Sequence, residues 1–370
     1  MINLKIKKSV PVQRTARVMQ LEGIFDVAPT QTSDEFYEVN LPIDEFDWQI
    51  GLIVGSSGSG KTTIAKEIWG DKIDRKYEWS ENESIVDSFP RDMSIKEITM
   101  LLSSVGFSSP PLWLRPFHIL SNGEKFRVNI ARVLSENRDD LCVVDEFTSV
   151  VDRTVAKIGS AAISKTIRRS KRKFIAVSCH YDISQWLEPD WIYETNTARF
   201  ARDRLQRPEI KLEIKRVHSS AWQLFEKYHY LDRKLNKSAR CFVGFFEGSP
   251  VTFTAVLPFP HPHRSGWREH RTVCLPDFQG IGLGNAMSES VARIFVATGK
   301  PYFSTTSNSA MITHRAKSKL WDMKRNPSRV SDGTKTAILK KTFSSNRLTA
   351  GFEFVGKADY DAAKSFGIIK

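Results

Sequence analysis

A glycine-rich stretch near the N-terminus, "GSSGSGKT" at 55–62, constrains the fold of this chain more than any other feature. It fits the pattern G-x-x-x-x-G-K-[ST], follows the apolar run "IGLIV" at 50–54 and precedes a helical pattern. In such a strand–loop–helix unit, glycines allow backbone N–H groups to turn onto phosphate oxygens at the start of a helix. The stretch therefore predicts an α/β domain that binds a nucleotide.

The side chains of this loop indicate which groups of the nucleotide they contact. Lys61 is expected to reach the β- and γ-phosphates of ATP, and the Thr62 hydroxyl is expected to hold Mg²⁺. The residues predicted to bind ATP here are Gly55, Gly58, Gly60, Lys61, Thr62 and Thr63.

Three further motifs follow in order along the chain. They are "LSNGEKFRVNIARVL" at 120–134, "LCVVDEFTSVVD" at 141–152 and "FIAVSCH", which ends at His180. Together with the first loop they resemble the signature helix, the Walker B strand with its D-loop, and the switch histidine of ABC-type ATPases. Each motif alone has an ordinary structural explanation, such as a serine cap, but their complete order favours the family.

The resemblance implies a role for each motif. Asp145 would orient Mg²⁺, Glu146 would polarise the attacking water, and His180 would contact the γ-phosphate. Ser121 and Gly123 would close over ATP bound to a second copy of the chain, which predicts an ATP-dependent homodimer.

The chain departs from the ABC pattern at several positions. Phe147 stands where the family has a proline, and Asn122 takes the signature's second glycine position. No glutamine is found for the Q-loop, where Asp87 is the nearest stand-in, and the helical segment before Ser121 is short for the family. Phe25 is the aromatic residue expected to stack on adenine.

The chain is expected to contain two domains. Up to about residue 198, β-like and helical runs alternate, as in a parallel sheet covered by helices. The charged stretch "ARFARDRLQRPEIK" at 198–211 has no apolar period and reads as a boundary. We therefore predict an ABC-type ATPase domain over 1–205 and a second domain over 206–370.

The second domain has a different expected order of helices and strands. "KLEIKRV" reads as a strand and "SSAWQLFEKYHYL" as a helix, whereas "ARCFVGFFEG" and "PVTFTAVLPF" read as neighbouring strands joined at "EGSP". Residues 282–297 read as a helix. The pattern predicts an α+β domain with a mixed, mostly antiparallel sheet.

The positive charge of the chain lies in its C-terminal part. Residues 1–210 hold 29 Lys+Arg against 30 Asp+Glu, whereas residues 211–370 hold 26 against 12, a net charge of +14. Confinement of the charge to one domain favours a polyanionic partner over general solubility. We expect nucleic acid, with DNA as the first choice and tRNA as the second.

A second glycine-rich loop, "QGIGLG" at 279–284, has no lysine. A dinucleotide fingerprint starting at Gly280 requires glycine at position 285, which is Asn285, so that interpretation fails. The spacing instead resembles the Q/R-x-x-G-x-G/A loop of GNAT N-acetyltransferases, whose amides hold the pyrophosphate of coenzyme A. The resemblance covers roughly 211–345, and the alternative is a bare turn that caps a core helix.

The GNAT resemblance implies acetyl-CoA, or another acyl-CoA, as the cofactor. The strand before the loop would pair with the pantetheine arm. The residues predicted to bind this cofactor are Val273, Leu275, Gln279, Gly280, Gly282 and Gly284.

Acyl transfer requires an unprotonated amine beside a thioester and often an acid for the leaving thiolate. "SAMITHRAKSKLW" lacks the tyrosine that many GNAT enzymes have there. "YHYL" and "STTSNSAMITHRAKSKLW" resemble the Mom-like DNA-modification group of phage Mu, which modifies the exocyclic amine of adenine. Tyr230, Arg271, Ser304 and Asn308 are the predicted catalytic residues, with His229 and Tyr302 as further candidates.

Two other functions stay open from the sequence. In the first, the second domain is a non-catalytic binding module of a regulatory ATPase. In the second, it acetylates a protein or a small amine. "HPHR" at 261–264 with His270 is expected to be a solvated loop and not a metal site. No segment has the apolar length of a membrane span, and we expect a cytoplasmic protein.

Overall fold

A computed structural model describes residues 1–73, 77–136, 141–202, 210–229, 233–329 and 348–370. The chain divides into two compact units. Unit 1 contains residues 1–76, 137–150 and 167–207, and unit 2 contains residues 77–136, 151–166 and 208–370. The predicted domain boundary at 205/206 falls outside the described residues and stays a prediction.

Unit 1 is built on a five-stranded sheet with the strand order β4-β5-β3-β6-β7. All of its strand pairs are parallel except β6 with β7. The strands are β3 (Ile50–Val54), β4 (Leu141–Val144), β5 (Lys173–Ser178), β6 (Trp191–Glu194) and β7 (Arg199–Ala201). Each residue of β3 is buried, as the uninterrupted apolar run of that strand requires.

Two helices accompany this sheet in unit 1. They are α2 (Lys61–Trp69), which follows the glycine-rich loop, and the short α7 (Ser184–Leu187). Ile64 and Ala65 of α2 join the buried cluster that contains Ile53 and Val177 of the sheet. The alternating α/β pattern expected for the N-terminal part is therefore present.

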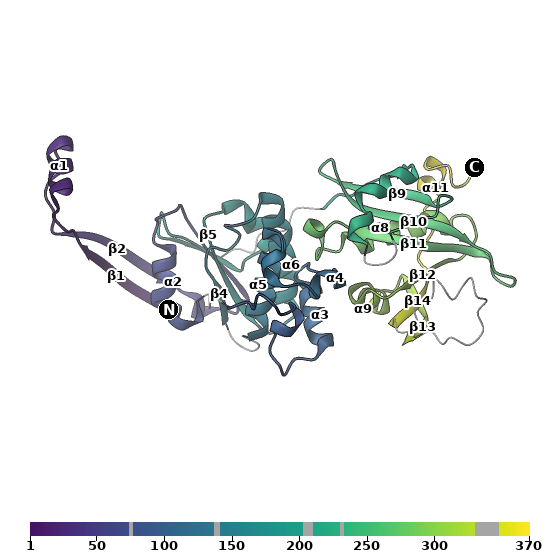
Figure 1. Ribbon diagram of the computed structural model, residues 1–370, viewed down its shortest axis with the longest axis horizontal. Coiled ribbons are helices and arrows are strands. Elements are labelled where there is room, and N and C mark those ends of the chain that lie inside the picture. Colours follow the sequence, from purple (N-terminus) through teal and green to yellow (C-terminus); the bar gives the residue numbers. More distant parts are fainter. Residues whose placement is uncertain (74–76, 137–140, 203–209, 230–232, 330–347) are drawn as a thin grey trace. The chain divides into compact units, whose positions relative to one another are not determined.

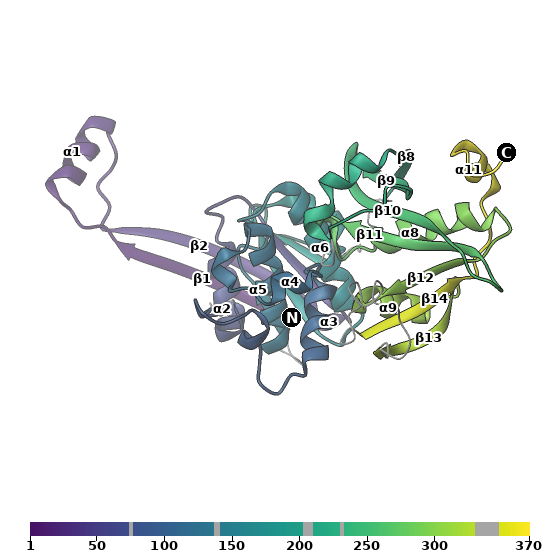
Figure 2. The ribbon, with the colours of Figure 1, turned by 45° about the vertical axis from the view of Figure 1, so that its right-hand side comes forward.

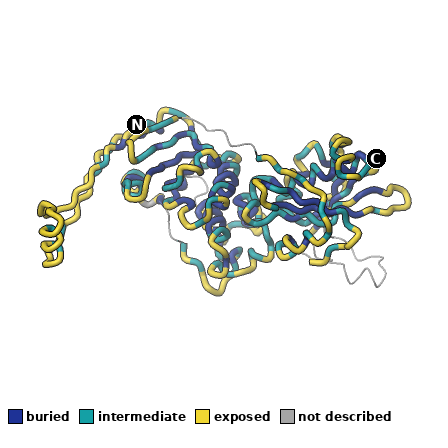
Figure 3. Tube along the Cα trace, turned by 90° about the horizontal axis from the view of Figure 1, so that it is seen from above, coloured by how far each residue is buried: buried dark blue, intermediate teal, exposed yellow. Residues whose placement is uncertain are grey.

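A two-stranded arm extends from unit 1 (Figure 1). It consists of β1 (Ile2–Pro11) paired antiparallel with β2 (Thr32–Leu41), and α1 (Ala16–Phe25) lies at its far end. α1 has no buried residue, and most of the arm is coloured as exposed in Figure 3.

Unit 2 begins with a group of helices. They are α3 (Ile95–Ser104), α4 (Pro110–Trp113), α5 (Asn122–Glu136) and the part of α6 (Arg153–Arg168) up to Thr166. Ser94 and Glu97 form a reciprocal capping box at the start of α3. A Cβ atom on Gly159 of α6 would lie 2.7 Å from the Phe126 ring of α5, so glycine permits the close packing of these two helices.

The sheet of unit 2 has seven strands in the order β13-β14-β12-β11-β10-β9-β8 (Figure 2). Its pairs are antiparallel except β11 with β12. The strands are β8 (Glu213–Val217), β9 (Arg240–Phe246), β10 (Ser249–Phe259), β11 (Gly266–Cys274), β12 (Tyr302–Thr306), β13 (Trp321–Arg329) and β14 (Leu348–Phe354). The sheet is mixed and mostly antiparallel, as the sequence predicts.

Helices cover this sheet through a large apolar cluster. α8 (Leu283–Val296) contributes Met287, Val291 and Phe295, which pack with Phe242 and Trp267 of the strands. α9 (Ser309–Lys317) follows β12, and α11 (Tyr360–Ser365) lies near the C-terminus. The helix expected over 282–297 therefore forms almost over that range.

A second cluster forms around Trp222, Phe225 and Phe253. The segment expected to be one helix, "SSAWQLFEKYHYL", instead forms two short 3₁₀ helices at Ser219–Leu224 and Glu226–Tyr228. Trp222 and Phe225 are three residues apart, and a three-residue turn places both side chains against the sheet. The tight turn between β9 and β10 lies at Glu247 and Gly248, whose φ angles of 48° and 78° suit a hairpin.

Candidate functional site

The parallel strands of unit 1 bring three sequence motifs to one edge of the sheet. β5 lies between β3 and β4, with Val54 opposite Ser178 and Val144 opposite Ala176. Because all three strands run in the same direction, the segments that follow them emerge at the same edge. The glycine-rich loop, Asp145 with Glu146, and His180 therefore follow neighbouring strand ends.

The glycine-rich loop folds around the Lys61 side chain. Lys61 Nζ donates to the carbonyl oxygens of Gly55 at 3.0 Å and Ser56 at 2.7 Å. Gly58 and Gly60 have φ angles of 80° and 83°, a region that glycine enters without strain. The loop then passes into α2, whose first residues are Lys61, Thr62 and Thr63.

Segment 195–196 supports the loop from the adjacent strand. Thr195 Oγ1 lies 2.5 Å from Ser59 Oγ, and Asn196 Oδ1 accepts from the Ser56 N–H at 2.8 Å. A Cβ atom on Gly55 would lie 2.1 Å from Thr195 Oγ1. Gly55 is therefore required by close packing within the protein.

Tyr37 of β2 is an aromatic residue that lies against the loop. A Cβ atom on Gly60 would lie 2.1 Å from the Tyr37 ring, so the ring covers this glycine. Phe25, the residue expected to stack on adenine, is 68% exposed at the end of α1. Sequence reasoning missed Tyr37, although it lies closer in sequence to the glycine-rich loop than Phe25 does.

The segment after β4 has an unusual backbone. Glu146 and Thr148 have φ angles of 47° and 69°, which side chains other than glycine rarely adopt. Between them, the Phe147 N–H donates to Val177 O at 2.8 Å, and Ser178 Oγ donates to Phe147 O at 2.8 Å. The ABC pattern has a proline at this position, and a proline has no N–H to donate. The hydrogen bond from residue 147 to Val177 therefore depends on the replacement of that proline.

His180 is held beside this segment. Its backbone N–H donates to Ser178 Oγ at 3.1 Å, and its Nδ1 lies 3.2 Å from Thr148 Oγ1. The strained turn and the histidine are therefore linked by a side-chain contact between neighbouring strand ends.

Two side chains near this edge carry oxygen atoms of the kind that magnesium prefers. Thr62 supplies a hydroxyl at the start of α2, and Asp145 supplies a carboxylate whose Oδ1 accepts from the Glu146 N–H at 2.9 Å. Mg²⁺ takes hard oxygen ligands and commonly uses few protein groups, with phosphate and water completing its shell. No cluster of three or more His, Cys, Asp or Glu able to hold a metal occurs among the described residues.

The predicted signature residues open α5 in unit 2. Ser121 and Glu124 form a reciprocal cap, with the Ser121 N–H donating to Glu124 Oε2 at 2.8 Å and the Glu124 N–H donating to Ser121 Oγ at 3.4 Å. Ser121 and Asn122 are exposed, and Gly123 is half-buried against Val155. The capping explanation therefore holds for Ser121, which stays exposed at the start of α5.

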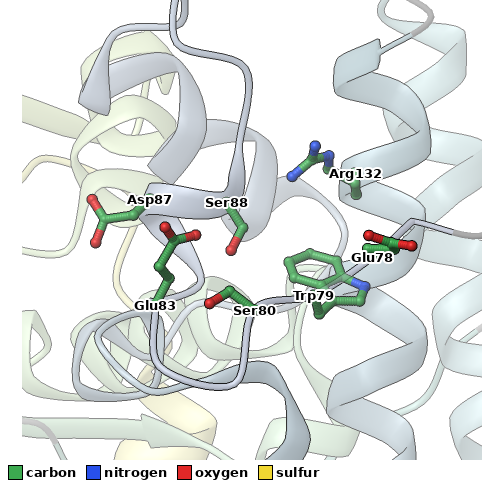
Figure 4. Close-up of a pocket in the computed structure, with 7 residues that line it drawn as sticks. All are labelled: Glu78, Trp79, Ser80, Glu83, Asp87, Ser88 and Arg132. Atoms are coloured by element: carbon green, nitrogen blue, oxygen red, sulfur yellow. The ribbon is translucent and has the colours of Figure 1, made fainter.

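A cavity of about 390 Å³ lies in the helical part of unit 2 (Figure 4). Carboxylates, hydroxyls, an indole and a guanidinium line it: Glu78, Trp79, Ser80, Glu83, Asp87, Ser88 and Arg132. Asp87, the stand-in for the Q-loop glutamine, accepts from Ser84 Oγ at 2.5 Å. The Trp79 ring stacks on Phe117 with ring centroids 4.4 Å apart, which gives the cavity a rigid aromatic side.

The second glycine-rich loop joins β11 to α8. Gly282 has a φ angle of 100° and precedes the first residue of α8, whereas Gly280 has a φ angle of 92° and lies against Ala162 and Gly106. A Cβ atom on Gly284 would meet only Cys274 Cβ, at an ordinary 3.6 Å. Packing and backbone conformation thus account for Gly280 and Gly282, but neither requires glycine at 284.

The strand before this loop separates from its parallel neighbour. β11 and β12 pair only at Trp267 with Tyr302 and Arg268 with Phe303. A bulge in β11 at His270, opposite Ala255 and Val256 of β10, re-aims the strand at that point. Beyond the second pair the backbone of β11 has no ladder partner on the β12 side among the described residues.

Two predicted cofactor-binding residues, Val273 of β11 and Leu275 just after it, pair with β10 on the other side of the strand. The Leu275 N–H donates to Val251 O at 2.9 Å, and Val273 is opposite Phe253 of β10. The N–H and C=O groups of successive residues in a strand point to opposite sides. Those of Thr272 and Cys274 therefore point away from β10, toward the side of β12. Gln279 uses its Nε2 to donate to Cys274 O at 2.9 Å, so this residue supports the loop itself.

The Cys274 thiol at this strand end is a poor nucleophile. Burial raises the pKa of Cys274 to about 12, and Arg127 and the Gly284 N–H lower it by less. The thiol therefore stays protonated near neutral pH.

The predicted catalytic residues have different surroundings. Arg271 donates from Nη1 to His270 O at 3.0 Å and from Nη2 to Lys234 O at 3.2 Å. Asn308 caps α9, with its Oδ1 accepting from the Met311 N–H at 3.0 Å. Tyr230 lies outside the described residues, and the His229 ring packs edge-on against Trp222.

Ser304 belongs to a buried polar network that the sequence analysis missed. Arg315 of α9, 1% exposed, donates from Nη1 to Ser304 Oγ and from Nη2 to Glu269 Oε2 at 3.0 Å and Ser288 Oγ at 2.8 Å. Burial raises the pKa of the adjoining Tyr302 well above its ordinary value, an effect that Glu269 increases. No periodicity or motif indicates this network, because its members come from β11, β12, α8 and α9.

Within the described part of the chain, the histidines of the "HPHR" segment belong to no group of three or more His, Cys, Asp or Glu side chains that could hold a metal ion. The His261 and His263 rings have centroids 6.0 Å apart, and His270 Nε2 accepts from the Asn236 N–H at 3.4 Å. No helix in the described part of the chain has the length and apolar character needed to cross a membrane.

No protein-family model matches this chain. The energy-coupling factor transporter ATP-binding protein EcfA1 of Geobacillus kaustophilus is 24% identical over 219 residues, which cover 48% of this chain and 75% of that protein. ABC transporter E family member 3 of Arabidopsis thaliana is 28% identical over 165 residues, which cover 38% of this chain and 91% of that protein.

Solved ATP-binding cassettes are also similar to part of the chain. The cassette MJ0796, in a dimeric post-hydrolysis state bound to ADP and Pi, has a TM-score of 0.35 at 17% identity and covers 45% of this chain and 92% of its own. The cbiO1 structure from Clostridium perfringens has a TM-score of 0.34 at 18% identity, with coverages of 44% and 76%. The two sequence relatives and the order of the motifs support an ABC-type ATPase domain that covers about half of the chain, and thereby ATP binding.

Proposed function

We propose that this protein is an ABC-type ATPase joined to a GNAT-like acyltransferase that modifies an exocyclic amine of a nucleic-acid base. The ATPase part of the proposal is supported by the relatives and by the neighbouring strand ends that carry Lys61, Asp145, Glu146 and His180. ATP hydrolysis between two copies of the chain is the expected reaction, with the signature residues of one copy facing the nucleotide of the other.

The residues of the sheet edge have complementary tasks in this reaction. Lys61 and the loop amides bind the phosphates, Glu146 accepts hydrogen bonds from the attacking water and orients it, and His180 positions the γ-phosphate. Bound Mg²⁺ would neutralise developing charge on the phosphate oxygens. Thr62 and Asp145 are the residues that would hold the ion.

One observation supports the acyltransferase more than any other: β11 and β12 separate at the point where a glycine-rich loop opens α8. The separation leaves the Thr272 backbone open to a linear, amide-containing ligand such as pantetheine. A Cβ atom on Gly282 would lie 3.7 Å from Lys165 Nζ, so a lysine adds its charge to the positive helix start. A diphosphate that is held and not cleaved needs only this kind of environment.

The proposed transfer forms one C–N bond and breaks one C–S bond. The amine nitrogen attacks the thioester carbonyl, the thiolate of coenzyme A leaves, and the amine proton passes to a base or to solvent. An exocyclic amine in a base pair is not accessible, so the base would be flipped or single-stranded. The net charge of +14 over 211–370 favours DNA, and tRNA is the second choice.

Two measurements test the proposal. Calorimetry should detect independent binding of ATP·Mg²⁺ and acetyl-CoA to the full chain, and competition between them for one site would overturn the two-site proposal. Nucleoside mass spectrometry of DNA and tRNA from expressing cells should detect an acylated base that disappears with Gly284→Val.

A regulatory ATPase with a non-catalytic GNAT-like module is the second candidate. It is favoured by the roles of Ser304 in a buried network and of Asn308 as a helix cap, since neither role presents a catalytic group. An unmodified nucleoside profile together with intact ATP hydrolysis would support this candidate. Acetylation of a peptide or small amine, with no salt-sensitive binding to DNA, would instead indicate a different acceptor.

A further inference from the structure

α5 of unit 2 carries a buried arginine that neither proposed site uses. Arg127 is 1% exposed. Its Nη1 donates to Gly106 O at 3.1 Å and to Pro276 O, and its Nη2 donates to Asp277 O at 2.8 Å. One guanidinium therefore joins the signature helix, the turn after α3 and the segment that leads into the second glycine-rich loop.

The cost of burying this charge makes the arrangement specific. Desolvation lowers the pKa of Arg127, an effect opposed by the nearby Asp277 carboxyl, although an arginine stays charged. A buried guanidinium requires acceptors in fixed positions, and here backbone carbonyls supply them. The conformation of residues 276–277 is consequently tied to the position of Arg127.

Direct packing holds the following residues to the same helices. Gln279 Oε1 accepts from the Ser108 N–H at 3.1 Å. A Cβ atom on Gly280 would lie 2.6 Å from Ala162 Cβ, and one on Gly106 would lie 2.7 Å from Gln279 O. Two glycines thus allow close contact between this loop, the turn after α3 and helix α6.

The position of Arg127 in α5 suggests what displaces that helix. It lies six residues after the exposed Ser121 and four after the half-buried Gly123, the two residues expected to contact ATP bound to a second copy. We propose that Arg127 is a positioning residue through which ATP between two copies sets the conformation of 276–284 and the affinity of that loop for acyl-CoA. The second clause rests on the proposed acyltransferase, whereas the first depends only on the ATPase.

Hydrogen exchange of the full chain tests the positioning role without coenzyme A. In Glu146→Gln protein, addition of ATP·Mg²⁺ should slow or accelerate exchange of the amides in 276–286 several-fold. With Arg127→Met added, the same amides should no longer respond while ATP still binds. Arg132→Met, on the same helix but pointed at the Trp79 and Tyr77 rings, should keep the response.

Absence of any ATP effect on 276–286, or its persistence with Arg127→Met, would overturn the proposal. If Arg127→Met fails to fold, Arg127→Lys keeps the charge but cannot bridge three carbonyls, and it should reduce the response. The exchange measurement on Glu146→Gln protein remains decisive in either case.

Acetyl-CoA calorimetry separates this inference from the proposed function. The affinity for acetyl-CoA should change about five-fold or more when ATP·Mg²⁺ is bound, and the affinity for ATP should change equally in return. An Arg127-dependent exchange response without acetyl-CoA binding would retain the positioning role and reject the acyl-CoA site. If acetyl-CoA binds with the same affinity with and without ATP, and ATP causes no exchange response, the acyl-CoA site is retained and the positioning role of Arg127 is rejected.

Discussion

Single residues in this protein make contacts that their sequence motifs do not indicate. Phe147 replaces the proline of the ABC pattern, and its N–H donates to Val177 O across to β5. Tyr37 covers Gly60, although Phe25 was the predicted adenine partner. Lys61 opens α2 and Glu146 follows β4, and the residue-scale predictions concern these two.

Lys61→Ala should weaken ATP binding strongly. The ammonium makes charge-assisted contacts with phosphate, and loss of about 3 kcal/mol corresponds to roughly a 100-fold weaker affinity. Calorimetry with ATP·Mg²⁺ measures the effect. Lys66→Ala, an exposed lysine one turn further along α2, should bind ATP normally.

Glu146→Gln should bind ATP but hydrolyse it roughly 10²- to 10⁴-fold more slowly, because the amide is a poor acceptor for the proton of water. The trapped state should accumulate as a dimer, which light scattering detects. A monomer in the presence of excess ATP·Mg²⁺ would contradict the sandwich arrangement, and Glu67→Gln provides an exposed matched control.

At the scale of elements, two features have different expected roles. The loop before α8 is expected to bind a ligand, and the polar network around Arg315 is expected to stabilise the fold. The loop combines glycines required by packing with Gly284, which packing does not require. The network joins β11, β12, α8 and α9 through Glu269, Ser304, Ser288 and Arg315. It fixes the strands at the place where they separate.

Gly284→Val should weaken acetyl-CoA binding at least about ten-fold, or 1.4 kcal/mol, without unfolding the protein. The added side chain meets only Cys274 at its base, but its branches cover the amides at the start of α8. Calorimetry and thermal melting give the two readouts. The exposed Ala286→Val on the same helix is the control, and equal affinities for acetyl-CoA in both variants would reject the second site.

Arg315→Met should destabilise the protein by about 3–5 kcal/mol, since it leaves the Glu269 carboxylate buried without its cation. Urea unfolding measures the loss. The double variant Glu269→Gln with Arg315→Met should recover part of this free energy, because the uncompensated charge is gone. Equal stability of the single and double variants would show that the ion pair is not the cause.

At the scale of the whole molecule, the positive charge lies in one continuous part of the sequence, whereas each structural unit is made of several separate segments. Unit 2 combines α3, α4, α5 and most of α6 with the seven-stranded sheet. All of the excess positive charge follows residue 210, so a polyanion is expected to bind the later part of the chain.

Binding of the full chain to duplex DNA should therefore depend strongly on salt. If about six phosphates are contacted, the affinity should fall roughly 10³-fold between about 50 and 200 mM salt. Fluorescence anisotropy at several salt concentrations measures the slope. An affinity that does not change with salt would exclude the proposed electrostatic contact with nucleic acid.

The sequence by itself determined the local units of this protein. Glycine spacing, apolar runs and helix caps depend on residues close in the chain, and so the loop at 55–62, the turn at Glu247–Gly248 and helix α8 were predictable. The mixed, mostly antiparallel second sheet also followed from the order of its strands.

Only the tertiary structure decided which side chains meet across distant segments. Arg127 contacts Pro276 and Asp277, and Arg315 contacts Glu269, over separations that no local pattern encodes. The physical reason is that a buried charge is stabilised by whatever acceptors folding brings to it, and those acceptors are here largely backbone carbonyls or carboxylates from other elements.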